Sequence, residues 1–474
     1  MLRSVKNIDR SFFINHSILK KHIALLNQIR ENFQPEDRII CIRAPGRVNL
    51  IGEHTDYNMG PVLPCAIDRE IVFCLRANFS KEISMSNIES KFEKFRFTWQ
   101  KPILPYAKGH WGNYIKAGIK GIVDFLAQED YNQINSLRGF DAIVSSTLPS
   151  AAGLSSSSAL VVASALSLLA INEIYMDKLK IADICAEAEH FVGTAGGGMD
   201  QATCLLGEKD AFLKIEFNPL RVHSIAAPKN IALILFHSLV EAQKSHNVRE
   251  EYNRRVLECR ISVDLFNRFM VNQNSGNNQK INYIGEIRSD FLLLDPLELD
   301  NLVARFLEKL KDSYSLKEIA NILNTSKGQL TARYQNILKS DVLKEPTNGF
   351  SIKRRFRHVY TECNRVNRMV DCLQKNDITG MSRLIKESHD SLSNDYEVSI
   401  PEVAHLIKLL RESGITGARL IGAGFGGMVL ALSERSRREQ VIEKMKQNFY
   451  AQKVKGSLDN YIIPCLTSDG AGGI

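Results

Sequence analysis

The feature that most restricts the fold of this 474-residue chain is a serine-rich stretch that leads directly into a long apolar run, LPSAAGLSSSSALVVASALSLLA (residues 148–170). A flexible linker would not continue into so apolar a segment. We therefore expect a loop of small residues at the start of a buried helix, where free N–H groups and the helix dipole bind phosphate. The spacing is not that of a Walker loop, and no Gly-Lys dipeptide occurs in the chain, which excludes a P-loop enzyme.

A second segment, RAPGRVNLIGEHTDYN (residues 43–58), places two arginines and a run of four polar residues after the apolar lead-in RIICI. A surface loop would not need so apolar a lead-in, and a core strand would not tolerate so much charge. The segment therefore indicates a chemical role.

Two glycine-rich segments follow. In AEAEHFVGTAGGGMDQ (residues 186–201) the triple glycine lets the backbone approach a ligand closely, and the Asp200 carboxylate could take a proton from a hydroxyl nucleophile. Alternatively, Asp200 caps a helix that begins at Gln201.

The other segment, GARLIGAGFGG (residues 417–427), matches the spacing G-x-G-x-x-G, which is a weak signal by itself. A dinucleotide-binding unit would need an acidic residue at the end of a following strand, but REQVIEKMKQ looks helical. The companion motifs of protein kinases are missing. A plain tight turn remains open.

The order of apolar patterns predicts a mixed chain. Residues 1–37 look like a helical lead-in, and strand-like runs (RIICI, IVFCLRA, DAIVSST, DAFLKIEF) then alternate with helical ones up to about Phe217, which suggests an α+β domain. Residues 241–395 look mostly helical. The tail returns to strands and finishes in SDGAGGI, most simply a frayed end.

Length and composition indicate what class of protein this is. The length favours two domains, and a net charge of +8 hints at anionic ligands such as nucleotides without approaching a nucleic-acid-binding composition. Nine cysteines without a C-x-x-C pair indicate reduced thiols and no zinc site. The start lacks the apolar core of a signal peptide, and the longest apolar run is too short to span a bilayer. We expect a cytoplasmic protein with no membrane partner.

Taken together, the motifs APGRVNLIGEHTDYN, LPSAAGLSSSSA, GGGMDQ and GARLIGAGFGG resemble, in order and spacing, those of the GHMP kinase superfamily. The first motif is similar to that of the galactokinase and N-acetylgalactosamine kinase branch, as are HWGNYIKAGI and ESHDSLSNDYEVSIPEV. The likeness runs from about Asp37 to the end. It implies a two-domain α+β fold: an N-terminal domain (1–225) with a left-handed βαβ unit and a ferredoxin-like C-terminal domain (226–474) with a helical insertion at about 270–350. The active site would lie in the cleft between them.

The resemblance also implies roles for single residues. Asp200 would be the base for the anomeric hydroxyl, and Arg47 would stabilise the transferring phosphoryl group and keep Asp200 ionised. Sugar hydroxyls would be bound by Arg47, Glu53, His54, Thr55, Asp56, Asp200 and Tyr252. The ATP phosphates would lie on Ala151, Ala152, Gly153, Leu154, Ser155, Ser156 and Ser157, with Trp111 at the adenine or simply in the core. Mg²⁺ would be held by Ser157 (or Ser156) and Glu189.

Three residues depart from the family pattern. Ala151 replaces the first glycine of the phosphate loop, Ile421 a threonine and Met428 a small residue of the third motif. We expect these changes to tune nucleotide affinity without abolishing activity.

We predict a monomeric kinase that takes ATP and a monosaccharide, converting galactose to galactose 1-phosphate. N-Acetylgalactosamine remains an alternative substrate, because the choice depends on the space around C2. A non-catalytic galactose sensor is disfavoured by the complete GLSSSSA run and by the presence of Asp200 and Arg47. Nucleic-acid binding through KRRFRH (residues 353–358) has little support, since that run reads more simply as a solvated helix face.

Overall fold

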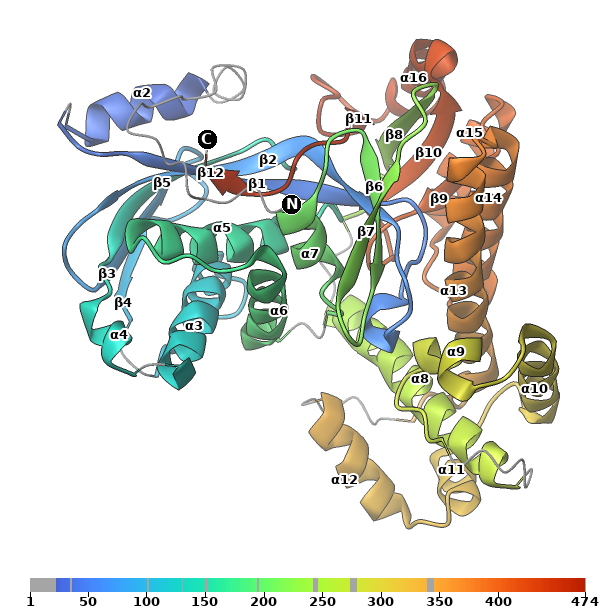
Figure 1. The fold of residues 1–474 in the computed structure, drawn as a ribbon. Helices are drawn as coiled ribbons and strands as arrows, with labels where there is room; N and C mark the ends of the chain where they lie inside the picture. Colours follow the sequence, from blue (N-terminus) through green and yellow to red (C-terminus); the bar gives the residue numbers. More distant parts are fainter. Residues whose placement is uncertain are drawn as a thin grey trace.

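The computed structural model describes residues 23–34, 36–99, 102–129, 131–149, 152–193, 196–241, 246–272, 279–338 and 345–473. Helices and strands are both abundant along the chain, which confirms the α+β class (Figure 1). The largest buried cluster takes side chains from both halves of the chain, among them Leu235 of the second sheet and Val366 of a C-terminal helix. The division at residue 225 therefore stays a prediction.

A six-stranded sheet forms the N-terminal half, in the order β12-β1-β2-β5-β3-β4, with β3 and β5 parallel and the other pairs antiparallel. Its strands are β1 (Ile40–Asn49), β2 (Pro64–Ala77), β3 (Glu82–Asn87), β4 (Phe95–Thr98), β5 (Phe140–Ser146) and β12 (Gly472–Gly473). On one face, α5 (Ser156–Ile171) and α7 (Met199–Leu206) pack against β1 and β2, and α3 (Gly112–Glu129) and α6 (Lys178–Ala188) pack against α5 in turn. The other face packs against α2 (Ile23–Asn32) (Figure 1). The short α4 (Tyr131–Ser136) follows α3, and the hairpin of β6 (Ala211–Glu216) and β7 (Arg221–Ala226) closes this half.

Helix α5 is the apolar run predicted to be a buried helix. Its serines do not interrupt it, because buried Ser164 and Ser167 donate to the carbonyl oxygens of Val161 (2.9 Å) and Ala163 (2.7 Å). A Cβ at Gly118 of α3 would lie 2.2 Å from the Val161 carbonyl oxygen. The glycine thus lets α3 approach α5 closely and fixes α5 under the sheet.

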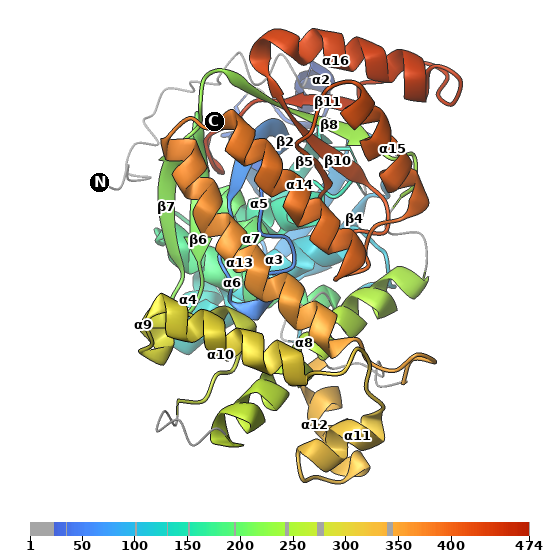
Figure 2. The same ribbon diagram turned by 90° about the vertical axis from the view of Figure 1, so that its right-hand side faces the viewer.

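A four-stranded antiparallel sheet, β11-β8-β10-β9, forms the core of the C-terminal half. Its strands are β8 (Ile231–His237), β9 (Ala418–Leu420), β10 (Met428–Glu434) and β11 (Ile462–Cys465). Around it lie α13 (Ile352–Gln374), α14 (Ile378–Asn394), α15 (Pro401–Glu412), α16 (Arg438–Met445) and a π-helical turn, η6 (Lys446–Tyr450) (Figure 2). A helical extension comprises α8 (His246–Asn272), η4 (Ile284–Glu286), α9 (Ser289–Leu292), α10 (Pro296–Lys309), α11 (Leu316–Ile322) and α12 (Lys327–Leu338).

Strand β1 corrects the view that the segment after RIICI is too charged for a core strand. The strand continues to Asn49, with a shift in register between Pro45 and Arg47. Arg43 is buried there because its Nε lies 2.6 Å from the Glu70 carboxylate. An ion pair and hydrogen bonds therefore make the buried charge tolerable.

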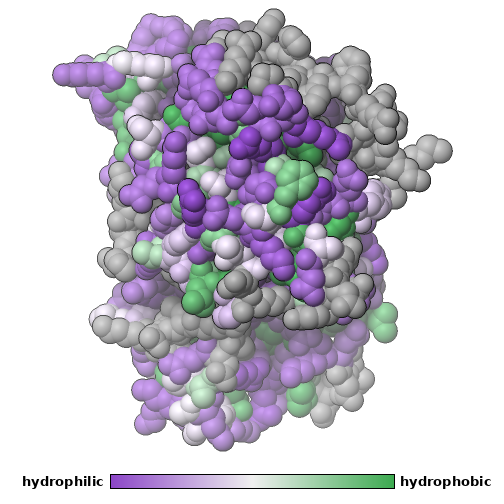
Figure 3. All heavy atoms as spheres, turned by 90° about the vertical axis from the view of Figure 1, so that its left-hand side faces the viewer, coloured by the Kyte–Doolittle hydropathy of each residue, from purple (hydrophilic) through white to green (hydrophobic). Residues whose placement is uncertain are grey.

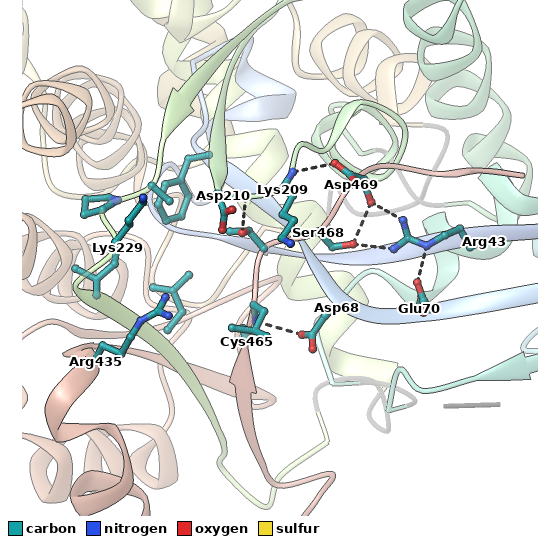
Figure 4. A pocket seen from close by; sticks show the side chains of 17 residues that line it. Arg43, Asp68, Glu70, Lys209, Asp210, Lys229, Arg435, Cys465, Ser468 and Asp469 are labelled. Carbon is teal, nitrogen blue, oxygen red and sulfur yellow. Dashed lines mark hydrogen bonds and ion pairs between the residues drawn. The ribbon is translucent and has the colours of Figure 1, made fainter. Parts of the chain in front are cut away.

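The same arginine explains why the C-terminal segment is ordered, where a frayed end was expected. Its guanidinium donates to Ser468 Oγ (2.7 Å) and to the Asp469 carbonyl oxygen (2.8 Å), as Figure 4 shows. Beyond this point β12 pairs with β1. A cavity of about 680 Å³ lies beside this crossing, and Lys209, Lys229 and Arg435 are among its lining residues.

The KRRFRH run of α13 is not the solvated helix face that the sequence suggested. Arg355 is 2% exposed, with Nε 2.6 Å from Glu258 and Nη2 2.5 Å from Glu397. Phe356 and His358 are fully buried. Helices α8 and α14 pack against α13 and cover these residues, which a local charge pattern cannot reveal.

The surface seen from the side of α2 is mainly hydrophilic, with apolar side chains scattered over it (Figure 3). Among the described residues, no helix is both long and apolar enough to cross a membrane.

Candidate active site

A cavity of about 440 Å³ lies where the segments singled out in the sequence meet. It is lined by the loop before α5, the 421–427 loop, the start of α7, the polar run after β1 and one side of α8. These five segments lie far apart in the chain, and the fold brings them together.

The serine-rich loop turns sharply before it enters α5. Gly153 (φ +76°) and Ser155 (φ +59°) lie in the left-handed region, and Ser155 is the N-cap of α5. The residues of this loop that line the cavity are Gly153, Leu154, Ser155, Ser156 and Ser157. The first N–H groups of a sixteen-residue helix therefore lie at the cavity.

The 421–427 loop joins β9 to β10 and is more than a tight turn. Gly422, Gly424, Phe425, Gly426 and Gly427 all have positive φ. A Cβ at Gly422 would lie only 3.4 Å from the Gly153 Cα, so the two glycine loops face each other across the cavity. A side chain at Gly422 would enter this narrow space.

Arg47 and Asp200 form the central ion pair of the site. Nε of Arg47 lies 2.7 Å from Asp200 Oδ1, and Nη1 donates to the Gly153 carbonyl oxygen (2.7 Å). Ser155 Oγ donates to the other oxygen of Asp200 (2.6 Å). Burial lowers the pKa of Arg47, but the charges of Asp200 and Glu53 outweigh that effect and raise it. The arginine is thus permanently charged.

The structure contradicts the alternative in which Asp200 is a helix cap. Helix α7 begins at Met199, its N-cap is Gly198 (φ +96°), and Asp200 lies within its first turn. The carboxylate is bonded to Arg47 and Ser155, which lie outside α7.

Two more carboxylates face the cavity. Glu53 is 3% exposed, and its Oε1 accepts from Arg419 Nη2 and from the Gly422 N–H, both at 3.1 Å. Asp56 Oδ2 accepts from the Gly197 N–H at 3.0 Å. Burial, and then the charge of Asp200, raise the pKa of Asp56 to about 6.

His54 and Tyr252 complete this end of the cavity. His54 has φ +64°, and its Nδ1 lies 2.9 Å from the Tyr57 hydroxyl oxygen. Its Nε2 is buried and has no hydrogen-bond partner among the described residues. Burial holds the pKa of His54 well below its usual value, so the ring is neutral. Tyr252 of α8 brings its ring to 5.7 Å from the His54 ring, centroid to centroid.

Thr55 is not brought to the cavity. Its buried hydroxyl contacts the carbonyl oxygens of Gly52 (2.9 Å) and Pro61 (2.8 Å) and thereby shapes the loop. Ala152 is likewise buried in the core, and Ala151 lies outside the described residues.

Glu189 lies beside the serine loop, as a metal ligand would. Its Oε2 accepts from Ser158 Oγ (2.8 Å) and from the side-chain amide of Gln201. Burial and the charge of Asp200 raise the pKa of Glu189 to about 7, while Ser158 and Ser157 act against this shift. No cluster of three or more His, Cys, Asp or Glu able to hold a metal occurs in the described part of the chain. One carboxylate and neighbouring hydroxyls fit Mg²⁺ that also binds substrate phosphates.

Trp111 is held in the core, away from the cavity lining. It is 9% exposed, packs against Phe92 and Phe95, and donates through Nε1 to the Glu93 carbonyl oxygen at 3.0 Å. One turn later, Tyr114 lines the cavity instead.

Of the departures from the family pattern, Ile421 lines the cavity with 1% of its surface exposed, and Met428 is fully buried at the start of β10.

Several residues of the site were not singled out from the sequence. They are Tyr57, Tyr114, Ser158, Gln201 and Arg419. Tyr57, Ser158 and Gln201 lie inside motifs that were recognised, so their position was a usable signal. Arg419 reaches Glu53 across more than three hundred residues, and no local pattern predicts that pair.

Comparisons with known proteins agree with this geometry. The galactokinase galactose-binding signature matches residues 29–77, and the GHMP kinase N-terminal and C-terminal domains match residues 113–208 and 369–451. A protein of Dictyostelium discoideum described as galactokinase is 30% identical, covering 98% of this chain and 96% of the relative.

Two solved structures are similar in fold. Lactococcus lactis galactokinase complexed with galactose has a TM-score of 0.70 at 21% identity, covering 95% of this chain and 99% of the other. Methanococcus jannaschii mevalonate kinase has a TM-score of 0.52 at 15% identity, covering 92% and 100%.

Proposed function

The chain belongs to the galactokinase family of GHMP kinases, and we propose that it transfers the γ-phosphoryl group of ATP to the C1 hydroxyl of D-galactose, giving ADP and galactose 1-phosphate. The observation that carries the proposal is the Arg47–Asp200 pair, which lies between the serine loop and the polar run after β1. One end of the cavity suits phosphate, and the other suits a hydroxyl-rich ring.

Galactose binds at the end lined by Glu53, His54, Asp56 and Tyr252. The two carboxylates accept from sugar hydroxyls, and the aromatic side chains of His54 and Tyr252 offer flat apolar surface beside them. Glu53 is held by Arg419 and Gly422, so its free oxygen has a fixed position. Such preorganised groups orient the sugar at little entropic cost.

Asp200 accepts the proton of the C1 hydroxyl, or orients that hydroxyl for attack. Arg47 fixes the carboxylate and places positive charge next to the transferring phosphoryl group. Because the transition state of phosphoryl transfer is loose, positioning and charge stabilisation by these residues supply most of the catalysis.

The ATP phosphates bind at Gly153 to Ser157, on the N–H groups at the start of α5. Ser157 and Glu189 would hold Mg²⁺, which neutralises phosphate charge. Tyr114 lies at the same cavity, while a role for Trp111 at the adenine stays a prediction.

Galactose is favoured over N-acetylgalactosamine by the matching galactose-binding signature and by the relative's description. A non-catalytic sensor is disfavoured because the ion pair and the serine loop are both present in a geometry suited to transfer.

We also propose that the chain acts as a monomer in the cytoplasm. All nine cysteines are free thiols, as in reducing compartments.

The test is ATP consumption with magnesium, measured with galactose and with N-acetylgalactosamine in parallel. The proposal expects turnover with galactose and much slower turnover with the N-acetyl sugar. Faster turnover of the N-acetyl sugar would reassign the substrate. Turnover of neither sugar, with both sugar and ATP still bound, would favour the sensor.

A further inference from the structure

A chain of hydrogen bonds leads from the core of the C-terminal half to His54. The Tyr57 hydroxyl contacts His54 Nδ1 (2.9 Å) and the Tyr396 hydroxyl (2.7 Å), and the Tyr396 hydroxyl also contacts Cys259 Sγ (3.3 Å). All four side chains are at most 5% exposed. His54 and Tyr57 belong to the segment after β1, whereas Cys259 is in α8 and Tyr396 follows α14.

All four groups are uncharged at neutral pH. Burial raises the pKa of both tyrosines well above the usual value and that of Cys259 to about 11, and it lowers the pKa of His54. The thiol and the two hydroxyls each carry one hydrogen, and the neutral imidazole carries one N–H. Three bonds must therefore be made with these hydrogens.

Four donor arrangements make all three bonds, and they differ in which hydrogen is left over. In the first, Cys259 donates to Tyr396, Tyr396 to Tyr57, and Tyr57 to His54 Nδ1. In the other three, His54 donates from Nδ1 to Tyr57, and the hydrogen of Tyr57, Tyr396 or Cys259 is left without an acceptor, because these groups have no other hydrogen-bond partner among the described residues. The first arrangement pairs the thiol and both hydroxyl hydrogens and leaves over only the Nε2–H of His54, a residue that lines the cavity.

We infer that Tyr57, supported by Tyr396 and Cys259, positions His54 in the tautomer that carries its hydrogen on Nε2. The inference goes beyond sugar contact by His54 and rests on the proposed function only for its kinetic consequence. Nε2 is the buried atom of His54 that lacks a partner, and His54 lines the cavity. The site therefore presents an N–H donor among carboxylate acceptors.

This donor has a specific use. A sugar hydroxyl that donates to Glu53 or Asp56 still has lone pairs to be satisfied, and His54 Nε2–H can donate to them. If His54 carried its hydrogen on Nδ1 instead, Nε2 would add a further acceptor to a site already rich in acceptors. The chain of hydrogen bonds through Tyr57 thus favours ligands that place an acceptor oxygen next to Nε2 of His54.

The direct test is the ¹⁵N spectrum of the imidazole nitrogens in the full chain, without sugar, at neutral pH. His54→Gln identifies the His54 signals among the eleven histidines. We expect Nδ1 at the shift of an unprotonated nitrogen and Nε2 at that of a protonated one. The opposite pattern would overturn the inference. This readout does not depend on activity, so it separates failure of the inference from failure of the proposed function.

Tyr57→Phe tests the link by removing the hydroxyl that faces His54 while keeping the ring. We expect the two His54 nitrogen signals to move toward a tautomeric average, and kcat/KM for galactose to fall about fivefold or more, with KM for ATP unchanged. Tyr396→Phe should produce a smaller change of the same kind.

Tyr334→Phe is the matched control. It removes a buried hydroxyl that donates a hydrogen bond to Asp264 and lies outside the chain of hydrogen bonds to His54. It should leave the His54 signals and KM for galactose unchanged. Unchanged His54 signals in Tyr57→Phe, or equal changes in the control, would contradict the positioning role.

Discussion

Nε of Arg47 lies 2.7 Å from Asp200 Oδ1, and the same guanidinium donates through Nη1 to the Gly153 carbonyl oxygen. One side chain therefore fixes both the carboxylate at the sugar end and the loop at the phosphate end. Its bidentate reach needs the planar guanidinium, which a lysine would not reproduce. Arg47 therefore contacts both the proposed base and the proposed phosphate loop.

Asp200→Asn should lower kcat by about 10²–10⁴-fold while galactose still binds, because the amide keeps a hydrogen-bond acceptor but cannot take a proton. Coupled ATP consumption measures kcat, and calorimetry with galactose measures binding. Near-wild-type kcat would remove Asp200 from the mechanism.

Asp56→Asn should stabilise the protein at neutral pH while weakening galactose binding. The pKa of Asp56 is raised from 3.8 to about 6 in the folded state, so between these values the unfolded chain releases a proton that the folded chain retains. Stability is therefore lost as the pH rises through this window, by an amount on the order of 1–3 kcal/mol. Thermal unfolding above pH 6 should show a higher Tm for the variant. Below pH 3.8 the gain should vanish, and a gain that persisted there would contradict the cause given.

Because the pKa of Glu189 is raised, we expect the magnesium affinity of the protein to depend on pH. This pKa is raised to about 7, and only the ionised carboxylate binds the cation, so Mg²⁺ binding should weaken as the pH falls below 7. Titration of activity with Mg²⁺ at fixed ATP, on both sides of pH 7, measures this change. In Glu189→Gln affinity should be low at every pH, whereas Glu187→Gln, an exposed neighbour, should behave as wild type. Equal behaviour of the two variants would remove Glu189 from the metal site.

Gly197→Ala should raise KM for galactose about tenfold or more, because the added Cβ would lie 2.3 Å from the Asp56 carbonyl carbon and force the segment after β1 away from α7. Gly196→Ala is the control, since nothing lies within 4 Å of a Cβ there. Steady-state kinetics with both substrates should show the effect in the sugar KM of the first variant only. Similar kinetics for the two variants would show that the close approach at Gly197 does not shape the sugar end.

The local motifs predicted which segments the fold brings together around the cavity. The serine-rich run predicted a phosphate loop at the start of a buried helix, and α5 begins at Ser156 as that interpretation requires. The α+β class and the family were likewise recoverable, because glycine, serine and carboxylate spacings are imposed by close backbone approaches and are visible in a single chain.

What the sequence did not reveal depends on contacts between distant segments. The last residues looked frayed, yet they bond to Arg43 and pair with β1. The KRRFRH run looked solvated, yet its Arg355 is buried in ion pairs with Glu258 and Glu397. The family resemblance implied a sugar contact for Thr55, but its hydroxyl donates to the loop carbonyl oxygens of Gly52 and Pro61. In each case tertiary packing decides the role of a residue, and local composition does not contain that information.

The most direct test of the central claim is the ³¹P spectrum of the product formed from ATP and galactose by the wild-type chain, next to Asp200→Asn. The account predicts a single new phosphate monoester coupled to the anomeric proton, formed by the wild type and nearly absent with the variant. A phosphate on any other carbon, or equal product from both proteins, would contradict it.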